Sequence, residues 1–87
     1  MSIKESFNSA IKIVSQMKQQ PTNEEKLNLY KYYKQATVGD VNIPQPGFLD
    51  FTGKAKWNAW NSVKGTTSEN AMQLYIKTVN VLLNKNN

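Results

Sequence analysis

Cysteine, histidine and arginine are all absent from this 87-residue sequence. Without cysteine the chain has no disulfide framework and no thiolate nucleophile. The absence of histidine as well excludes a Cys/His zinc site and removes the commonest general base. The six acidic residues are scattered apart from the pair Glu24 and Glu25, which the start of a helix explains. We therefore expect a protein without catalytic residues, metal or cofactor.

Long hydrophobic runs are also missing, since no stretch approaches the roughly 18 apolar residues that span a bilayer. The first ten residues, MSIKESFNSA, place Glu5 and polar residues where a secretory signal has its apolar segment. The last residues carry no lipidation motif. These features predict a cytoplasmic protein. The length predicts one domain over 1–87 with a small core.

Positive charge predominates in this sequence. Eleven lysines against six acidic residues give a net charge of +5, and the pI is about 9.6. Such a balance favours anionic partners, whether nucleic acid, phospholipid or a phosphorylated metabolite. A small nucleic-acid-binding module is disfavoured because arginine, an RNP-like strand motif and a basic helix are missing. A bundle that binds a partner helix in an aromatic groove is a second alternative.

Hydrophobic spacing predicts helices and no strands. Apolar residues at 3, 7, 10, 11, 14 and 17 have the spacing of an amphipathic helix, which Pro21 ends. Thr22 stands three residues before Glu25, the spacing of a capping box, and predicts the start of a second helix. That helix is expected to end at Gly39, because glycine accepts the positive φ of a helix C-terminus.

The segment from about Val38 to Phe51 has neither helical nor alternating periodicity. Pro44, Pro46 and Gly47 interrupt it, and several apolar residues predict that it packs against the bundle. A connection of this length allows the flanking helices to run parallel, whereas a tight turn would make them antiparallel. The apolar residues are Val41, Ile43, Phe48 and Leu49.

A third helix is predicted from Asp50 or Thr52, either of which can act as its cap, to Gly65. Trp57 and Trp60 lie at i and i+3 in it and are expected to be core residues.

A fourth helix follows a short turn. Thr66 and Glu69 have capping-box spacing, and Thr67 with Asn70 offers a weaker version. The Asn-rich C-terminal end is expected to fray. The apolar stripe consists of Met72, Tyr75, Val79, Leu82 and Leu83.

The densest chemistry lies at 29–40, LYKYYKQATVGD. On a helix, Tyr30, Tyr33 and Lys34 share one face. Two phenol rings beside an ammonium can stack on a flat heterocycle and hold a phosphate. Tyrosines on an apolar stripe are as often ordinary core residues, but a lysine on the same stripe must reach solvent or find an anion. The pattern favours a nucleotide-binding surface.

This segment and residues 46–65, PGFLDFTGKAKWNAWNSVKG, together resemble the signature of the acyl-CoA-binding proteins, a small cytosolic family. The similarity extends from Phe7 through Pro21 to Tyr75. The resemblance implies an all-α, four-helix, up-down-down-up bundle with a long loop between the second and third helices. It also implies a monomer that carries and buffers medium- to long-chain fatty acyl-CoA in fatty acid metabolism. Transient contact with membranes or acyl-CoA-using enzymes is expected, and binding of nucleic acid is not.

The resemblance assigns roles to five residues. Lys34 and Lys56, with the Tyr30 hydroxyl, are expected to hold the ribose 3′-phosphate of CoA. Tyr33 and Tyr75 are expected to border the adenine and the beginning of the acyl chain. All five match the family pattern by residue type.

Four further positions are close to the expected site. Phe7 and Leu27 are core residues by periodicity alone, but the resemblance puts them beside the acyl groove. Ser15 and Thr52 depart from the pattern, because the family often has lysine at both positions. A lysine in place of Ser15 could reach the CoA phosphates or the thioester end. We expect somewhat weaker binding with recognition intact, because exposed charge contacts are weak.

Overall fold

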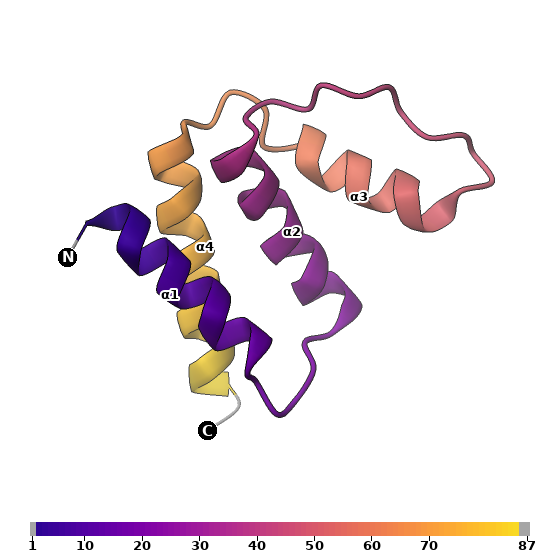
Figure 1. Ribbon diagram of the computed structural model, residues 1–87. Helices are drawn as coiled ribbons and strands as arrows, with labels where there is room; N and C mark the ends of the chain where they lie inside the picture. Colours follow the sequence, from indigo (N-terminus) through magenta and orange to yellow (C-terminus); the bar gives the residue numbers. More distant parts are fainter. Residues whose placement is uncertain (1, 86–87) are drawn as a thin grey trace.

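A computed structural model describes residues 2–85 as four helices, with no strand among them. They are α1 (Ile3–Ser15), α2 (Asn23–Thr37), α3 (Phe51–Asn61) and α4 (Ser68–Lys85), shown in Figure 1. The predicted all-α class is confirmed. The predicted fraying concerns Asn86 and Asn87, which lie outside the described residues.

The arrangement of the helices follows from three packing contacts. Helices α1 and α2 both pack on α4, and α3 packs on α2. The Lys56 ammonium lies over the Tyr30 ring, and one turn later on both helices the Lys34 ammonium lies over the Trp60 ring. These two contacts require α2 and α3 to run parallel, as Figure 1 shows. The up-down-down-up topology and the crossover loop are therefore confirmed.

The core forms around α4, which contributes half of its buried residues. Trp60 lies apart from this cluster, between α2 and the turn after it, and is only 2% exposed. Its indole N–H donates to the Gly39 carbonyl at 2.7 Å. Trp60 is thus structural, as predicted, while Trp57 is half-buried. The cluster consists of Phe7, Ala10, Leu29, Ala36, Ala71, Tyr75, Val79 and Leu82.

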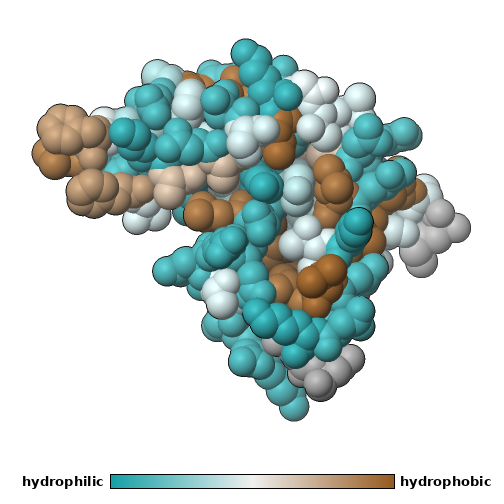
Figure 2. All heavy atoms as spheres, turned by 180° about the vertical axis from the view of Figure 1, so that it is seen from behind, coloured by the Kyte–Doolittle hydropathy of each residue, from teal (hydrophilic) through white to brown (hydrophobic). Residues whose placement is uncertain are grey.

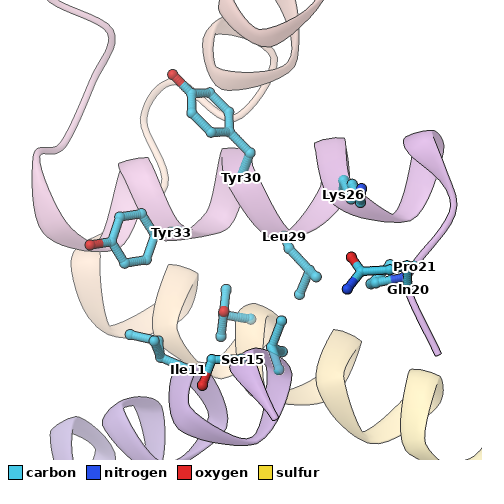
Figure 3. Close-up of a pocket in the computed structure, with 10 residues that line it drawn as sticks. Ile11, Ser15, Gln20, Pro21, Lys26, Leu29, Tyr30 and Tyr33 are labelled. Carbon is cyan, nitrogen blue, oxygen red and sulfur yellow. The ribbon is translucent and has the colours of Figure 1, made fainter. Parts of the chain in front are cut away.

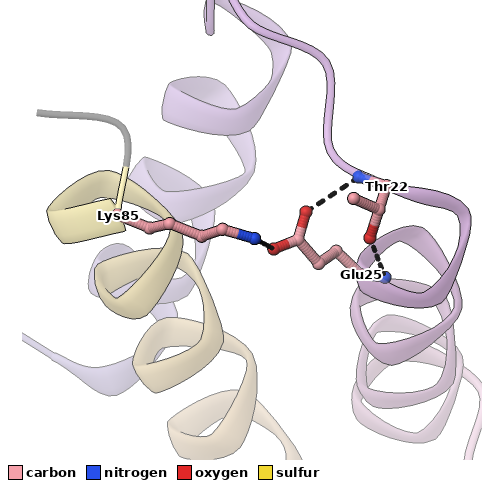
Figure 4. A network of polar contacts seen from close by, with 3 residues as sticks. All are labelled: Thr22, Glu25 and Lys85. Carbon is pink, nitrogen blue, oxygen red and sulfur yellow. Dashed lines mark hydrogen bonds and ion pairs between the residues drawn. The ribbon is translucent and has the colours of Figure 1, made fainter.

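The start of α2 is joined to the end of α4 by a polar network (Figure 4). The capping box is complete, because the Glu25 N–H donates to the Thr22 hydroxyl at 3.1 Å and the Thr22 N–H donates to the Glu25 carboxylate at 2.8 Å. The same carboxylate accepts from the Lys85 ammonium at 3.0 Å. These contacts lower the pKa of Glu25, mainly through the Thr22 N–H and then through Lys85.

The start of α3 matches one predicted alternative and that of α4 the weaker one. The Asp50 carboxylate caps α3 by accepting from Gly53 N–H at 3.0 Å. Thr67, the residue before α4, caps the helix with its hydroxyl, which accepts from the Asn70 N–H at 3.1 Å, so the capping box predicted at Thr66 is wrong. Thr66 belongs to the turn instead, since its carbonyl accepts from Gln35.

Two helices end earlier than their spacing predicts. Helix α1 ends at Ser15 although the apolar spacing continues to Met17. Helix α3 ends at Asn61, and a tighter turn leads to Gly65, whose φ is 92°. Gly39 follows Val38, the cap at the end of α2, and has a φ of 100°, as expected of a residue beyond a helix C-terminus.

The prediction that the loop from Val38 to Phe51 packs against the bundle is wrong for most of its apolar side chains. Ile43 is 51% exposed, and Phe48 and Leu49 are 73% and 76% exposed. The loop passes along the outer side of α3 (Figure 1), and α3 packs on α2 alone, so no helix covers that side. In the hydropathy-coloured view, apolar side chains gather where the loop joins α3 (Figure 2).

Candidate functional site

A cleft separates α1 from α2. Both helices pack on α4, but no Cα atom of α1 lies within 8 Å of a Cα atom of α2. The space left between them is a cavity of about 430 Å³ whose walls are mostly apolar (Figure 3). We call it the first cavity. It is lined by Ile11, Val14, Ser15, Gln20, Pro21, Lys26, Leu29, Tyr30, Tyr33 and Tyr75.

Three aromatic rings from three helices meet at one end of the first cavity. The Tyr75 ring contacts the Phe7 ring edge to face at 5.1 Å between centroids, and the Tyr33 ring lies 6.2 Å from Phe7 and 6.4 Å from Tyr75. Phe7 lies behind the two tyrosines, is 3% exposed and lines neither cavity described here. Burial, with a smaller contribution from Tyr33, raises the pKa of Tyr75, which therefore presents a neutral phenol.

A second cavity, of about 410 Å³, lies between α2 and α3. Leu27 and Phe51 supply apolar walls, and Lys56 reaches it from α3. Lys26 and Tyr30 line both cavities, so the two spaces adjoin across α2. The second cavity is lined by Asn23, Lys26, Leu27, Tyr30, Phe51, Thr52, Ala55 and Lys56.

The tyrosines of α2 point to different sides of the helix. In Figure 3, Tyr30 projects from the opposite side of α2 to Leu29, and the Tyr33 ring lies against the helix and does not point the same way as Tyr30. Tyr33 contacts rings of α1 and α4, whereas the Tyr30 ring lies 5.6 Å from the Lys56 ammonium of α3. The face predicted from i, i+3 spacing is therefore kept in part: both tyrosines line the first cavity, and Tyr30 also lines the second.

Lys34 is half-buried at the junction of α2 and α3. Its ammonium lies 4.9 Å from the centre of the Trp60 ring, and it lines neither cavity. The positive charge of Lys34 is therefore stabilised by the face of an aromatic ring and not by a carboxylate. Lys34 and Lys56 still project from adjoining helices at successive turns, so positive charge is concentrated at this junction.

Ser15 and Lys26 line the first cavity from α1 and α2 respectively. The Ser15 hydroxyl donates to the Lys12 carbonyl of its own helix at 2.7 Å. Among the described residues that line this cavity, Lys26 is the only cation, and the sequence did not single it out. The available signal was its position four residues before Tyr30, which puts both side chains on neighbouring parts of one helix surface.

Within residues 2–85, no three His, Cys, Asp or Glu side chains are grouped so that they could hold a metal ion. No helix in that range is both long enough and apolar enough to cross a bilayer. Neither cavity has an Asp or Glu among its described lining residues, while lysines line both. The cavities therefore suit a ligand that combines an apolar part with negative charge.

A small helical bundle with two adjoining cavities of this kind is a ligand-binding protein, and comparison with known proteins identifies its family. Residues 4–79 match the family model described as "Acyl CoA binding protein". The chain is 47% identical over 83 residues to the acyl-CoA-binding protein homolog of Drosophila melanogaster, covering 95% of this chain and 96% of that one. The chain therefore belongs to the acyl-CoA-binding protein family.

Solved structures agree. The crystal structure of the acyl-CoA-binding protein from Moniliophthora perniciosa is similar with a TM-score of 0.90 and 52% identity, over 98% of this chain and 83% of that one. Acyl-CoA-binding protein 2 of Oryza sativa is similar with a TM-score of 0.91 and 38% identity, over 98% and 94% of the two chains. Family and fold together support acyl-CoA binding.

Proposed function

We propose that this protein binds medium- to long-chain fatty acyl-CoA reversibly and without catalysis, and carries and buffers it in the cytoplasm. The observation that carries the proposal is the meeting of two cavities at Tyr30 and Lys26. An acyl-CoA ester joins a long apolar tail to a polyanionic nucleotide, so it needs an apolar surface next to a basic one. Burial of each CH₂ contributes about 0.8 kcal/mol. The tail therefore supplies much of the affinity, and the basic groups identify CoA.

In this proposal, Lys34 and Lys56 hold the ribose 3′-phosphate together with the Tyr30 hydroxyl. Support comes from the junction of α2 and α3, where the Lys56 ammonium lies beside the Tyr30 ring. Both ammonium groups rest on aromatic faces in the free protein. A cation–π contact leaves N–H donors of the ammonium available, so a phosphate can bind without first breaking an ion pair.

Tyr33 and Tyr75 border the adenine and the beginning of the acyl chain. Their rings line the first cavity, and Phe7 supports both from behind. Leu27 offers apolar surface to the acyl chain in the second cavity. Phe7 therefore acts on the ligand by holding the two tyrosines in position.

Lys26 compensates in part for the lysine that the family often has in place of Ser15. Both residues line the first cavity, from opposite walls, and Lys26 also lines the second. Its flexible side chain can therefore follow the phosphates or the thioester end of the ligand from either cavity.

The proposed partners are the ligand and, transiently, the membranes or acyl-CoA-using enzymes that exchange it; the protein is proposed to act as a monomer. Calorimetric titration with palmitoyl-CoA tests the proposal. We expect saturable one-to-one binding, weaker binding of free CoA, and weaker binding still of free palmitate. Equal affinity for palmitate and palmitoyl-CoA would mean that the site is a general lipid pocket.

A further inference from the structure

Three large apolar side chains project from one corner of the molecule. Phe48, Leu49 and Phe51 are 73%, 76% and 76% exposed, more than any other large hydrophobic side chain in the described part of the chain. They fall within four consecutive positions, at the turn before α3 and at its first residue. We call these three residues the apolar tip. Figure 2 shows apolar side chains gathered there, on a part that stands out from the main body.

Hydrogen bonds hold the apolar tip in a defined conformation. The Asp50 N–H donates to the Gly47 carbonyl at 3.0 Å, and the Asp50 carboxylate caps α3 at Gly53. A Cβ at Gly53 would collide with that carboxylate, so the turn and the helix start fit closely. The Trp57 indole also fastens the preceding loop by donating to the Ile43 carbonyl at 2.8 Å. The three side chains are therefore exposed by a turn whose conformation is fixed by hydrogen bonds.

The charge around the apolar tip is positive. Between Asp40 and Glu69 the chain has three lysines and a single acidic residue, Asp50, whose carboxylate is engaged in capping. Lys54 follows Phe51 by one turn of α3, and Lys56 lies on the next turn. Exposed aromatic and aliphatic side chains beside lysines are typical of surfaces that bind anionic phospholipid, where apolar insertion and charge attraction act together.

The shape of the apolar tip favours a bilayer over a folded partner. It is a convex projection of three side chains, whereas a stable protein interface buries roughly 800 Å² on each partner. A bilayer adapts to a projection because its headgroup and acyl boundary is fluid. Phe51 also lines the second cavity, together with Leu27 and Lys56, so the apolar tip is continuous with the candidate site.

We propose that the apolar tip, with Lys54, docks the protein on an anionic phospholipid bilayer and brings the opening of the second cavity to the lipid surface. Acyl-CoA partitions at such a surface with its tail among the lipids and its nucleotide in water. Docking would therefore place the acyl tail beside the apolar walls of the second cavity and the nucleotide beside its lysines. The docking itself is argued from the exposed apolar residues and the lysines near them; only its purpose rests on the proposed function.

The test uses vesicles of phosphatidylcholine with and without phosphatidylserine. The wild-type protein should sediment with the anionic vesicles, and added salt or pure phosphatidylcholine should reduce the bound fraction. The Phe48→Ser, Leu49→Ser double variant should bind anionic vesicles about tenfold more weakly, because it loses both inserted side chains. The Val81→Ser variant removes a side chain that is 58% exposed on α4 and should bind like the wild type.

A second measurement uses the absence of cysteine. Leu49→Cys and Val81→Cys each create one thiol, to which a polarity-sensitive fluorophore can be attached. Emission should shift to the blue with anionic vesicles for the label at 49 and stay unchanged at 81. Equal vesicle binding by the double variant and the wild type, or equal shifts at both labels, would overturn the proposal. A concentration-dependent dimer that the double variant abolishes would overturn it in favour of a second copy.

The two proposals fail separately. Phe48 and Leu49 line neither cavity, so the double variant should bind palmitoyl-CoA in solution as the wild type does. Palmitoyl-CoA binding without any vesicle binding would remove the docking surface alone. Vesicle binding by a protein that does not bind palmitoyl-CoA would remove the proposed function alone.

Discussion

Lys34 faces the Trp60 ring while its proposed ligand group is the ribose 3′-phosphate, and this phosphate can be removed from the ligand without altering the acyl chain. We predict that Lys34→Ala weakens palmitoyl-CoA binding by roughly 1.5 to 3 kcal/mol, the range for hydrogen bonds to charged groups. The wild type should bind palmitoyl-3′-dephospho-CoA more weakly than palmitoyl-CoA by a comparable amount. The variant should scarcely distinguish the two ligands in calorimetry.

This comparison is a double-mutant cycle and isolates the pairwise contact from the lost cation–π contact with Trp60. Lys54→Ala is the matched control, because Lys54 is a lysine of the neighbouring helix α3 and, like Lys34, lines neither cavity. It should show little coupling to the 3′-phosphate. If Lys34→Ala weakened both ligands by the same factor, the phosphate contact would belong to another residue.

Ser15 and Lys26 supply the second prediction at the residue scale. Lys26→Met should weaken palmitoyl-CoA binding several-fold at low salt, because it removes the cation shared by both cavities. Ser15→Lys should tighten binding modestly in the wild type. It should also restore part of the loss in the Lys26→Met background, since it supplies a cation from the opposite wall.

The effects at both positions should fade as salt is added, as expected for partly exposed charges. Lys77→Met, on the exposed surface of α4 away from both cavities, changes the net charge equally and serves as the control. Failure of Ser15→Lys to help in either background would show that a side chain at this position points away from the ligand.

At the scale of elements, the Thr22, Glu25 and Lys85 network joins the start of α2 to the end of α4. The pKa of Glu25 is lowered from its ordinary value of 4.5, so its ionised form is favoured in the folded state. The contribution to stability is therefore present above pH 4.5 and is lost as the pH falls through the lower folded-state value.

Glu25→Gln should lower the melting temperature at neutral pH, because the ion pair to Lys85 is lost while the amide can still accept from the Thr22 N–H. The difference from the wild type should shrink as the pH falls below 4.5. Glu24→Gln removes the same formal charge without touching the network and should be nearly neutral. A constant difference at all pH values would show that Glu25 acts through packing or helix propensity.

Asp40 has an equivalent position at the other end of α2. Its carboxylate accepts from the Gly65 N–H and from the Gln35 amide, both at 2.8 Å. These contacts, the Gly65 N–H foremost, lower the pKa of Asp40, so its stabilising effect also weakens in acid. The network joins the loop after α2 to the turn between α3 and α4 and thereby positions α3 beside Tyr30.

At the scale of the whole molecule, α3 differs from the other helices because it packs on α2 alone. A helix with so few neighbours should open locally more readily than the rest of the bundle. We predict that its backbone amides exchange with solvent faster than those of α2 and α4. Palmitoyl-CoA should slow them, because a ligand that touches Tyr30 and Lys56 links α3 to the remaining helices.

The same ligand should raise the melting temperature. Binding to the folded state alone adds about 2.7 kcal/mol to the free energy of unfolding at a hundredfold excess over Kd. Hydrogen exchange followed by mass spectrometry measures the local effect, and calorimetry the global one. Stabilisation of α4 with no change in α3 would contradict the role given to the second cavity. Free CoA serves as the comparison ligand and should give a smaller shift.

Much of the local structure was predictable from the sequence, because helices are stabilised by neighbours in the chain. Apolar spacing, capping residues and terminating glycines together located all four helices, and the Thr22 and Glu25 spacing predicted a capping box that forms in full. Gly39 adopts the positive φ expected after α2. The residues 29–40 and 46–65 also carried the family resemblance, which the comparisons confirm. Each of these features depends on residues a few positions apart.

Only the tertiary structure decided which surface each residue serves. Spacing put Tyr30 and Tyr33 on one face, and both line the first cavity, but the packing of α3 on α2 places Tyr30 alone in the second cavity as well. The exposure of Phe48 and Leu49 was likewise hidden, because an apolar loop residue is buried only if another element covers it. The position of Lys26 in both cavities likewise depends on which helices pack beside α2. Helix direction and cavity walls depend on contacts between residues far apart in the chain, and local spacing carries no information about them.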